Sequence, residues 1–82
     1  MLDKLREQIS SLDGVMLSLA AQRLDLVRQI GEYKREHGLP IRNLEVEEKA
    51  IQRARENHVN PQLAEDLQRL LIKYAVLEQE GC

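Results

Sequence analysis

An arginine and a glutamate stand at positions where the hydrophobic pattern of the chain calls for aliphatic side chains. The first pattern follows a helical 4-3-4-3 spacing through Leu5, Ile9, Leu12, Met16 and Leu19, and resumes at Leu26, Ile30 and Tyr33. Arg23 falls on this face between the two runs. On a later segment Glu47 lies between Leu44 and Ile51 in the same way. Both charges therefore point toward regions predicted to be packed.

Two further cations are spaced so that they can act with Arg23. Lys34 follows Arg23 by nearly three helical turns, so the side chains project in similar directions from Cα atoms roughly 16 Å apart. Arg6 projects about 100° away from Arg23 and would reach the same pocket only from a second chain. Three cations and a carboxylate in an aliphatic surrounding predict a cavity for a small molecule that bears more than one carboxylate.

Structural explanations for these charges stay open at this point. Arg23 and Glu47 would form a buried salt bridge if their helices met, and such a pair seldom adds net stability. A polar residue in a helix seam also fixes the register of the helices, as it does in coiled coils. Neither explanation gives Arg23, Glu47 and Lys34 a shared purpose.

The element that carries Arg6, Arg23 and Lys34 is predicted to be one long helix, from about residue 2 to about residue 37. No proline interrupts it, and its length would be about 54 Å. A compact chain of 82 residues has a radius of gyration of only about 12 Å. The helix would therefore protrude with its leucine seam exposed, and a second copy of the chain is the simplest partner. We expect a homodimer.

Two more helices are predicted after the segment HGLPIRN. Gly38 suits the position that follows a helix C-terminus, and Pro40 prevents continuation. Asn43 is expected to cap a second helix that runs to about Asn57. Asn60 is expected to cap a third, which begins at Pro61, continues to about Gln79 and is stopped by Gly81. The fold class is all-α.

Composition narrows the class of protein. The 82 residues allow one domain, 1–82, with 12 basic and 14 acidic residues and no Phe or Trp. This mixed charge lacks the basic field of a nucleic-acid-binding protein, and no apolar run is long enough for a membrane span. The single cysteine, Cys82, is expected to be an exposed thiol that forms no internal disulfide, which favours the cytoplasm. His37 and His58 lie in no ligand-like cluster, so no metal site is expected.

Three segments together resemble a known family. LREQISSLD at 5–13, AAQRLDLVRQIGEYK at 20–34 and GLPIRN at 38–43 are similar to the all-helical chorismate mutases, and the resemblance covers essentially the whole chain. It implies an intertwined homodimer of three-helix chains with one very long first helix. It also implies a reaction that needs no cofactor, the rearrangement of chorismate to prephenate within one molecule.

The resemblance implies a role for five residues of this chain. Arg6 would reach into the partner's site, and Arg23 would pair with a substrate carboxylate. Lys34 would contact the ether oxygen and a carboxylate, Glu47 would lie near the ring hydroxyl, and Gln79 would donate to the ether oxygen. These five are the predicted catalytic residues.

Three positions depart from the family pattern. The family usually has Asp at Asn43, Arg at Val46 and often Ser at Ala75. Asn43 and Ala75 are still predicted to line the substrate site, and Arg42 offers a cation that would compensate for Val46. The departures leave open an isochorismate pyruvate lyase or an amino-chorismate mutase on the same scaffold. A non-catalytic helical dimerisation or regulatory module is the alternative from a different class.

Overall fold

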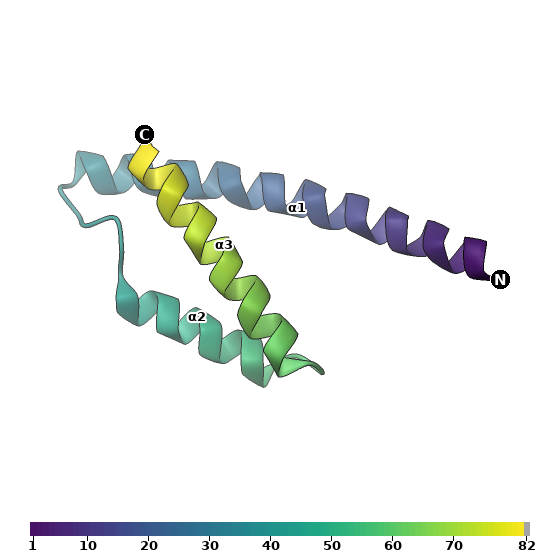
Figure 1. Ribbon diagram of the computed structural model, residues 1–82. Coiled ribbons are helices and arrows are strands. Elements are labelled where there is room, and N and C mark those ends of the chain that lie inside the picture. Colours follow the sequence, from purple (N-terminus) through teal and green to yellow (C-terminus); the bar gives the residue numbers. More distant parts are fainter. Residues whose placement is uncertain (82) are drawn as a thin grey trace.

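The computed structural model describes residues 1–81 and contains three helices, with no strand in that range. They are α1 (Leu2–Glu36), α2 (Leu44–Glu56) and α3 (Pro61–Gly81) (Figure 1). The prediction of an all-α chain with a very long first helix is confirmed. The prediction for Cys82 lies outside the described residues.

The end of α1 is defined by backbone hydrogen bonds around Gly38. The N–H of Gly38 donates to the Arg35 carbonyl, and the N–H of Leu39 donates to the Lys34 carbonyl at 2.8 Å. This pair of bonds is the Schellman arrangement, which requires a left-handed residue after the helix. Gly38 provides it with a φ of 63°. The turn sends the chain back toward the last turn of α1.

The predicted caps of α2 and α3 are confirmed. Asn43 accepts a hydrogen bond from the Val46 N–H at 3.2 Å, and Asn60 accepts one from the Leu63 N–H at 3.1 Å. The third helix, predicted to run to about Gln79 and to be stopped by Gly81, ends at Gly81, which is the last described residue.

The helix α3 holds the chain together. It packs against α2 and against α1, whereas α1 and α2 make no close approach to each other within the described residues. An ion pair between Arg28 of α1 and Glu78 of α3 adds a polar tie. The buried apolar side chains among residues 1–81 are those of Val27, Ile51 and Ala64. One chain therefore has a very small core.

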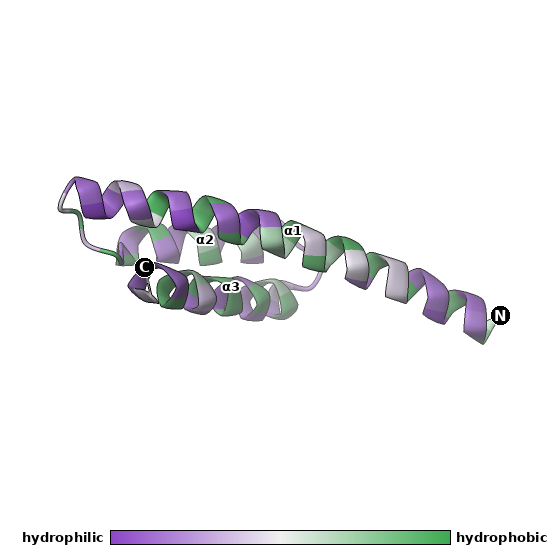
Figure 2. Ribbon diagram, turned by 90° about the horizontal axis from the view of Figure 1, so that it is seen from above, coloured by the Kyte–Doolittle hydropathy of each residue, from purple (hydrophilic) through white to green (hydrophobic). Residues whose placement is uncertain are grey.

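The first half of α1 extends away from the other helices (Figures 1 and 2). The molecule measures 55 × 25 × 15 Å, with a radius of gyration of 15.6 Å. A compact chain of this length would have a radius of about 12 Å, so the predicted protrusion is confirmed. The seam residues Leu5, Ile9, Leu12, Met16 and Leu19 are all exposed. None of the described helices is apolar over a stretch long enough to cross a membrane.

Candidate active site

A cavity of about 110 Å³ lies where the end of α1, the start of α2 and the second half of α3 meet. We call it the site cavity. Its lining residues are Lys34, Ile41, Asn43, Val46, Glu47, Ile72, Ala75, Val76 and Gln79. Five of the seven positions predicted to act on or bind a substrate are therefore in one place, although they come from three helices and a loop. The other two, Arg6 and Arg23, are not among them.

Lys34 is positioned by the loop that follows α1. Its Nζ donates a hydrogen bond to the Ile41 carbonyl at 2.6 Å, so the side chain bridges the last turn of α1 and the segment leading into α2. An ammonium group carries three N–H donors. One is used on Ile41, and the others are available to an anion or an ether oxygen in the site cavity.

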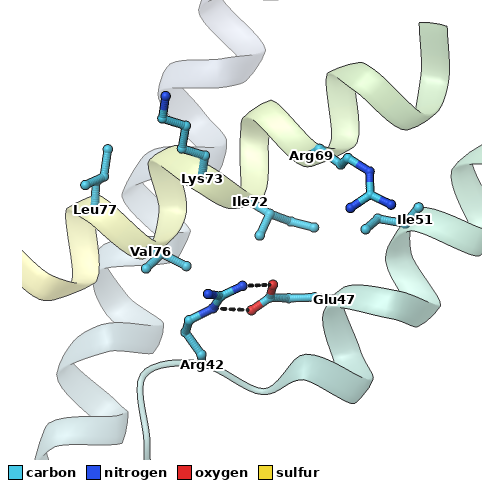
Figure 3. Close-up of a pocket in the computed structure, with 8 residues that line it drawn as sticks. All are labelled: Arg42, Glu47, Ile51, Arg69, Ile72, Lys73, Val76 and Leu77. Carbon is cyan, nitrogen blue, oxygen red and sulfur yellow. Dashed lines mark hydrogen bonds and ion pairs between the residues drawn. The ribbon is translucent and has the colours of Figure 1, made fainter. Parts of the chain in front are cut away.

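Glu47 is paired with Arg42, a relationship that the sequence analysis missed. Arg42 Nη2 donates to Glu47 Oε1 at 2.6 Å, and Arg42 Nε donates to Oε2 at 3.0 Å (Figure 3). This two-pronged contact is the geometry in which a guanidinium binds a carboxylate best. The side chain of Glu47 is 17% exposed and that of Arg42 is 53% exposed. The alternative pairing of Glu47 with Arg23 is not what the chain forms.

The pair sets the charge of Glu47. The hydrogen bond from Arg42 lowers the pKa of Glu47 below its ordinary value, with smaller help from the charges of Arg42 and Lys34. Partial burial opposes this shift, but does not overcome it. The same hydrogen bond raises the pKa of Arg42. Glu47 is therefore an ionised hydrogen-bond acceptor at neutral pH.

Gln79 reaches the site cavity because α3 approaches α1 closely at Gly31. Its Nε2 donates to the Val27 carbonyl of α1 at 3.2 Å. A Cβ on residue 31 would lie 3.0 Å from Gln79 Cγ, so a side chain there would push the glutamine away. A glycine inside a predicted helix gives no local sign of this role. Its use as a contact surface for Gln79 depends on how α1 and α3 cross.

Two residues that depart from the family pattern, Val46 on α2 and Ala75 on α3, make the wall of the site cavity less polar than the family pattern would. Val46 is 59% exposed and brings no charge, and Ala75 adds only a methyl group. The side-chain oxygen of Asn43 accepts the Val46 N–H, so this residue serves as the helix cap as well as lining the cavity.

Arg23 lies in a different hollow. Its Nη1 donates to the Leu71 carbonyl at 3.4 Å, and it lines a groove of about 990 Å³ between the middle of α1 and the α2–α3 pair. We call this the central groove. It shares no lining residue with the site cavity, so within one chain Arg23 and Lys34 line different hollows, and their joint action on a substrate stays a prediction.

Arg6 belongs to the protruding half of α1 and is exposed. Its predicted place in a partner's site is not tested by one chain and stays a prediction.

The histidines have local roles at helix ends. The His37 ring stacks on Tyr33 with 3.9 Å between ring centroids, and His58 Nδ1 accepts the Asn60 N–H at 2.9 Å. No group of three or more His, Cys, Asp or Glu residues within residues 1–81 is arranged to hold a metal ion.

Comparison with known proteins bears on the same residues. The family model described as chorismate mutase type II matches residues 5–80. This range contains all the residues that line the site cavity. The chain belongs to the chorismate mutase type II family. The resemblance seen in the sequence is thereby confirmed.

Individual relatives agree with the family. The chain is 40% identical over 76 residues to the T-protein of Enterobacter agglomerans, covering 88% of this chain and 20% of that protein. It is 31% identical over 81 residues to the bifunctional chorismate mutase/prephenate dehydratase of Escherichia coli K12, covering 94% of this chain and 21% of that protein.

A shorter match is to a 4-amino-4-deoxychorismate mutase of Streptomyces venezuelae, 40% identical over 40 residues, which are 49% of this chain and 39% of that protein. The chain thus spans about a fifth of the length of the first two relatives. No solved structure matches it.

Proposed function

We propose that this chain is a chorismate mutase, which converts chorismate to prephenate in aromatic amino-acid biosynthesis. The observation that carries the proposal is the meeting of Lys34, Glu47 and Gln79 in the site cavity of a member of this family. The reaction stays within one molecule: the ether C–O bond breaks while a C–C bond forms, and no atom enters or leaves. It therefore asks the protein for positioning and charge stabilisation.

Lys34 and Gln79 supply the charge stabilisation. The ether oxygen becomes more negative as its bond stretches, and an ammonium and an amide that are already in place favour that charge. Gln79 then exchanges its bond to the Val27 carbonyl for one to the substrate. Glu47, held ionised by Arg42, accepts a hydrogen bond from the ring hydroxyl. Together these contacts hold the substrate in its folded, reactive conformer.

The proposal includes a homodimer in which α1 of a second copy fills the central groove. One chain leaves the seam from Leu5 to Leu19 exposed, while the central groove is lined by apolar residues such as Leu63, Leu67 and Leu71. An exposed apolar stripe and an apolar groove on the same chain are complementary in a symmetric pair. This arrangement would bring the partner's α1, with its Arg6, alongside the site, and would enclose Arg23. A cytoplasmic location accords with a chain whose one cysteine allows no internal disulfide.

The decisive experiment incubates the purified chain with chorismate and follows prephenate formation. We expect turnover by the wild type and a loss of about 100- to 1,000-fold in kcat for Lys34→Ala, the range for a removed transition-state donor. Lys49→Ala is the matched control, because Lys49 lies on the exposed face of α2 and its ion-pair partner within residues 1–81 is Glu45. An unchanged kcat in Lys34→Ala would contradict the assignment of Lys34.

A second candidate is a mutase that acts on an amino-substituted chorismate. The match to a 4-amino-4-deoxychorismate mutase favours it, together with the apolar residues Val46 and Ala75 at the cavity wall. Parallel assays with chorismate, isochorismate and 4-amino-4-deoxychorismate separate the mutase, lyase and amino-mutase activities by their kcat/KM values. No conversion of any substrate by a dimer that is folded and confirmed by sedimentation would favour a non-catalytic helical module.

A further inference from the structure

The site cavity is short of positive charge for the substrate proposed above. Its lining holds one cation, Lys34, and one anion, Glu47, among the described residues, so these charges sum to zero. Chorismate brings two carboxylates. Moving a carboxylate out of water is costly unless a cation or several donors receive it. Lys34 is assigned to the ether oxygen and a carboxylate, and the other cations proposed for the substrate, Arg6 and Arg23, do not line this cavity within one chain. A further cation beside the cavity would therefore help to match the second carboxylate.

Arg42 is the cation beside this cavity. Together with Glu47, Ile72 and Val76 it lines a hollow of about 320 Å³, and these last three residues also line the site cavity. The two spaces therefore share part of their walls. Figure 3 shows Arg42 beneath Ile72 and Val76, with its guanidinium facing Glu47.

The guanidinium of Arg42 has N–H donors that are not bonded to Glu47. A guanidinium carries five N–H groups, and those of Arg42 that bond within residues 1–81 are one on Nε and one on Nη2, both to Glu47. The side chain is about half exposed, so it has room to shift toward a ligand. Glu47 keeps it close to the cavity and fixes the plane of its fork.

We propose that Arg42 binds one carboxylate of the substrate through its remaining N–H groups while it stays paired with Glu47. This inference rests on the proposed function and assigns to Arg42 the recognition of a dicarboxylate. It also explains how the site works with Val46, a residue without charge, on the adjacent turn of α2.

The first test compares Arg42→Ala with Arg69→Ala. Arg69 lines the same 320 Å³ hollow and is paired with Glu65 at 2.9 Å, so its removal changes the local charge equally without removing the proposed contact. We expect Arg42→Ala to raise KM for chorismate by about 10- to 100-fold, the range for a lost charged hydrogen bond, with a much smaller change in kcat. Equal KM values for the two variants would overturn the proposal.

The second test separates carboxylate binding from the mere positioning of Glu47. A non-reacting dicarboxylate analogue of chorismate and its two monoamides are titrated into the wild-type protein and Arg42→Ala by calorimetry. We expect one monoamide to bind the wild type about 10- to 100-fold more weakly than the dicarboxylate, and this difference to vanish in Arg42→Ala. If the difference persists, Arg42 only positions Glu47.

The outcomes also separate this inference from the proposed function. Calorimetry requires no turnover, so a protein that binds the dicarboxylate through Arg42 but forms no prephenate would retain this inference and lose the proposed function. A protein that forms prephenate with the same KM in Arg42→Ala would lose this inference alone. Circular dichroism of both variants confirms that each comparison is made between folded proteins.

Discussion

Gln79 of α3 lies directly against Gly31 of α1, with its Cγ 3.0 Å from the position that a Cβ on residue 31 would occupy. The glycine thus sets the distance between the two helices at the site cavity. A glycine here destabilises the helix by about 1 kcal/mol relative to alanine, but it leaves the space that Gln79 occupies.

Gly31→Ala should therefore lower turnover without unfolding the protein. The added methyl group forces Gln79 to shift by a few tenths of an ångström or more, and small displacements of a transition-state donor are costly to catalysis. We expect kcat to fall by about tenfold, with a melting temperature close to that of the wild type. Steady-state kinetics and thermal unfolding measure both quantities.

Gly14→Ala is the matched control for this prediction. Apart from its sequence neighbours and the backbone of its own helix, no atom of residues 1–81 lies within 4 Å of the position of a Cβ on Gly14, so the change should stabilise α1 by about 1 kcal/mol and preserve kcat. Equal kcat values for the two alanine variants would show that the contact between Gly31 and Gln79 does not matter for turnover.

Arg23→Leu should complete the apolar stripe of α1 and remove activity. Within the described residues 1–81 the arginine makes one long hydrogen bond, to the Leu71 carbonyl at 3.4 Å, so its loss costs little folding free energy. We expect an unchanged or higher melting temperature and a kcat/KM at least about 100-fold lower, since a charged contact to a substrate carboxylate is lost. If the variant unfolds instead, Arg23 has a structural role.

The pH at which kcat/KM begins to fall on acidification should depend on Arg42. The pKa of Glu47 is lowered from its ordinary value of 4.5, first of all by the hydrogen bond from Arg42. The contribution of this pair to the free energy of unfolding is therefore present above pH 4.5, and it is lost as the pH falls through the lowered pKa of Glu47. In Arg42→Met the remaining burial of Glu47 raises its pKa, so the loss of kcat/KM on acidification should begin at a higher pH.

A carbon-detected NMR titration of the Glu47 carboxylate measures this shift directly, alongside kcat/KM as a function of pH. Arg69→Met is the control and should leave the acid limb where it is in the wild type. An identical Glu47 pKa in the wild type and Arg42→Met would refute the assignment of the shift to the hydrogen bond.

Mixing two inactive variants should restore activity if Arg6 acts across a dimer. Arg6→Ala leaves Lys34 intact, and Lys34→Ala leaves Arg6 intact. A mixed dimer then contains one site with both residues and one site with neither, so random exchange should recover about a quarter of wild-type activity. The measurement is prephenate formation after co-refolding equal amounts of the two variants.

The same mixture also tests the alternative that Arg6 acts in the site of its own chain. If Arg6 served the site of its own chain, each site in a mixed dimer would lack one residue and the mixture would stay inactive. Sedimentation of the mixture and of each variant alone is the control for dimer formation.

The helices themselves were predictable from local features. Asn43 and Asn60 are caps, Gly38 takes a left-handed φ and Pro61 begins a helix, and each of these follows from interactions within a few residues.

The grouping of Lys34, Glu47 and Gln79 was anticipated through the family resemblance, since their separations along the chain carry no distance information. What the sequence alone determined was three amphipathic helices, one of them too long for a compact chain, because periodicity and capping act through near neighbours. The tertiary structure alone decided that Glu47 pairs with Arg42 rather than Arg23, and that Gly31 makes room for Gln79. Those contacts depend on the angles at which helices cross and on the path of a loop, which are set by packing between segments far apart in the sequence.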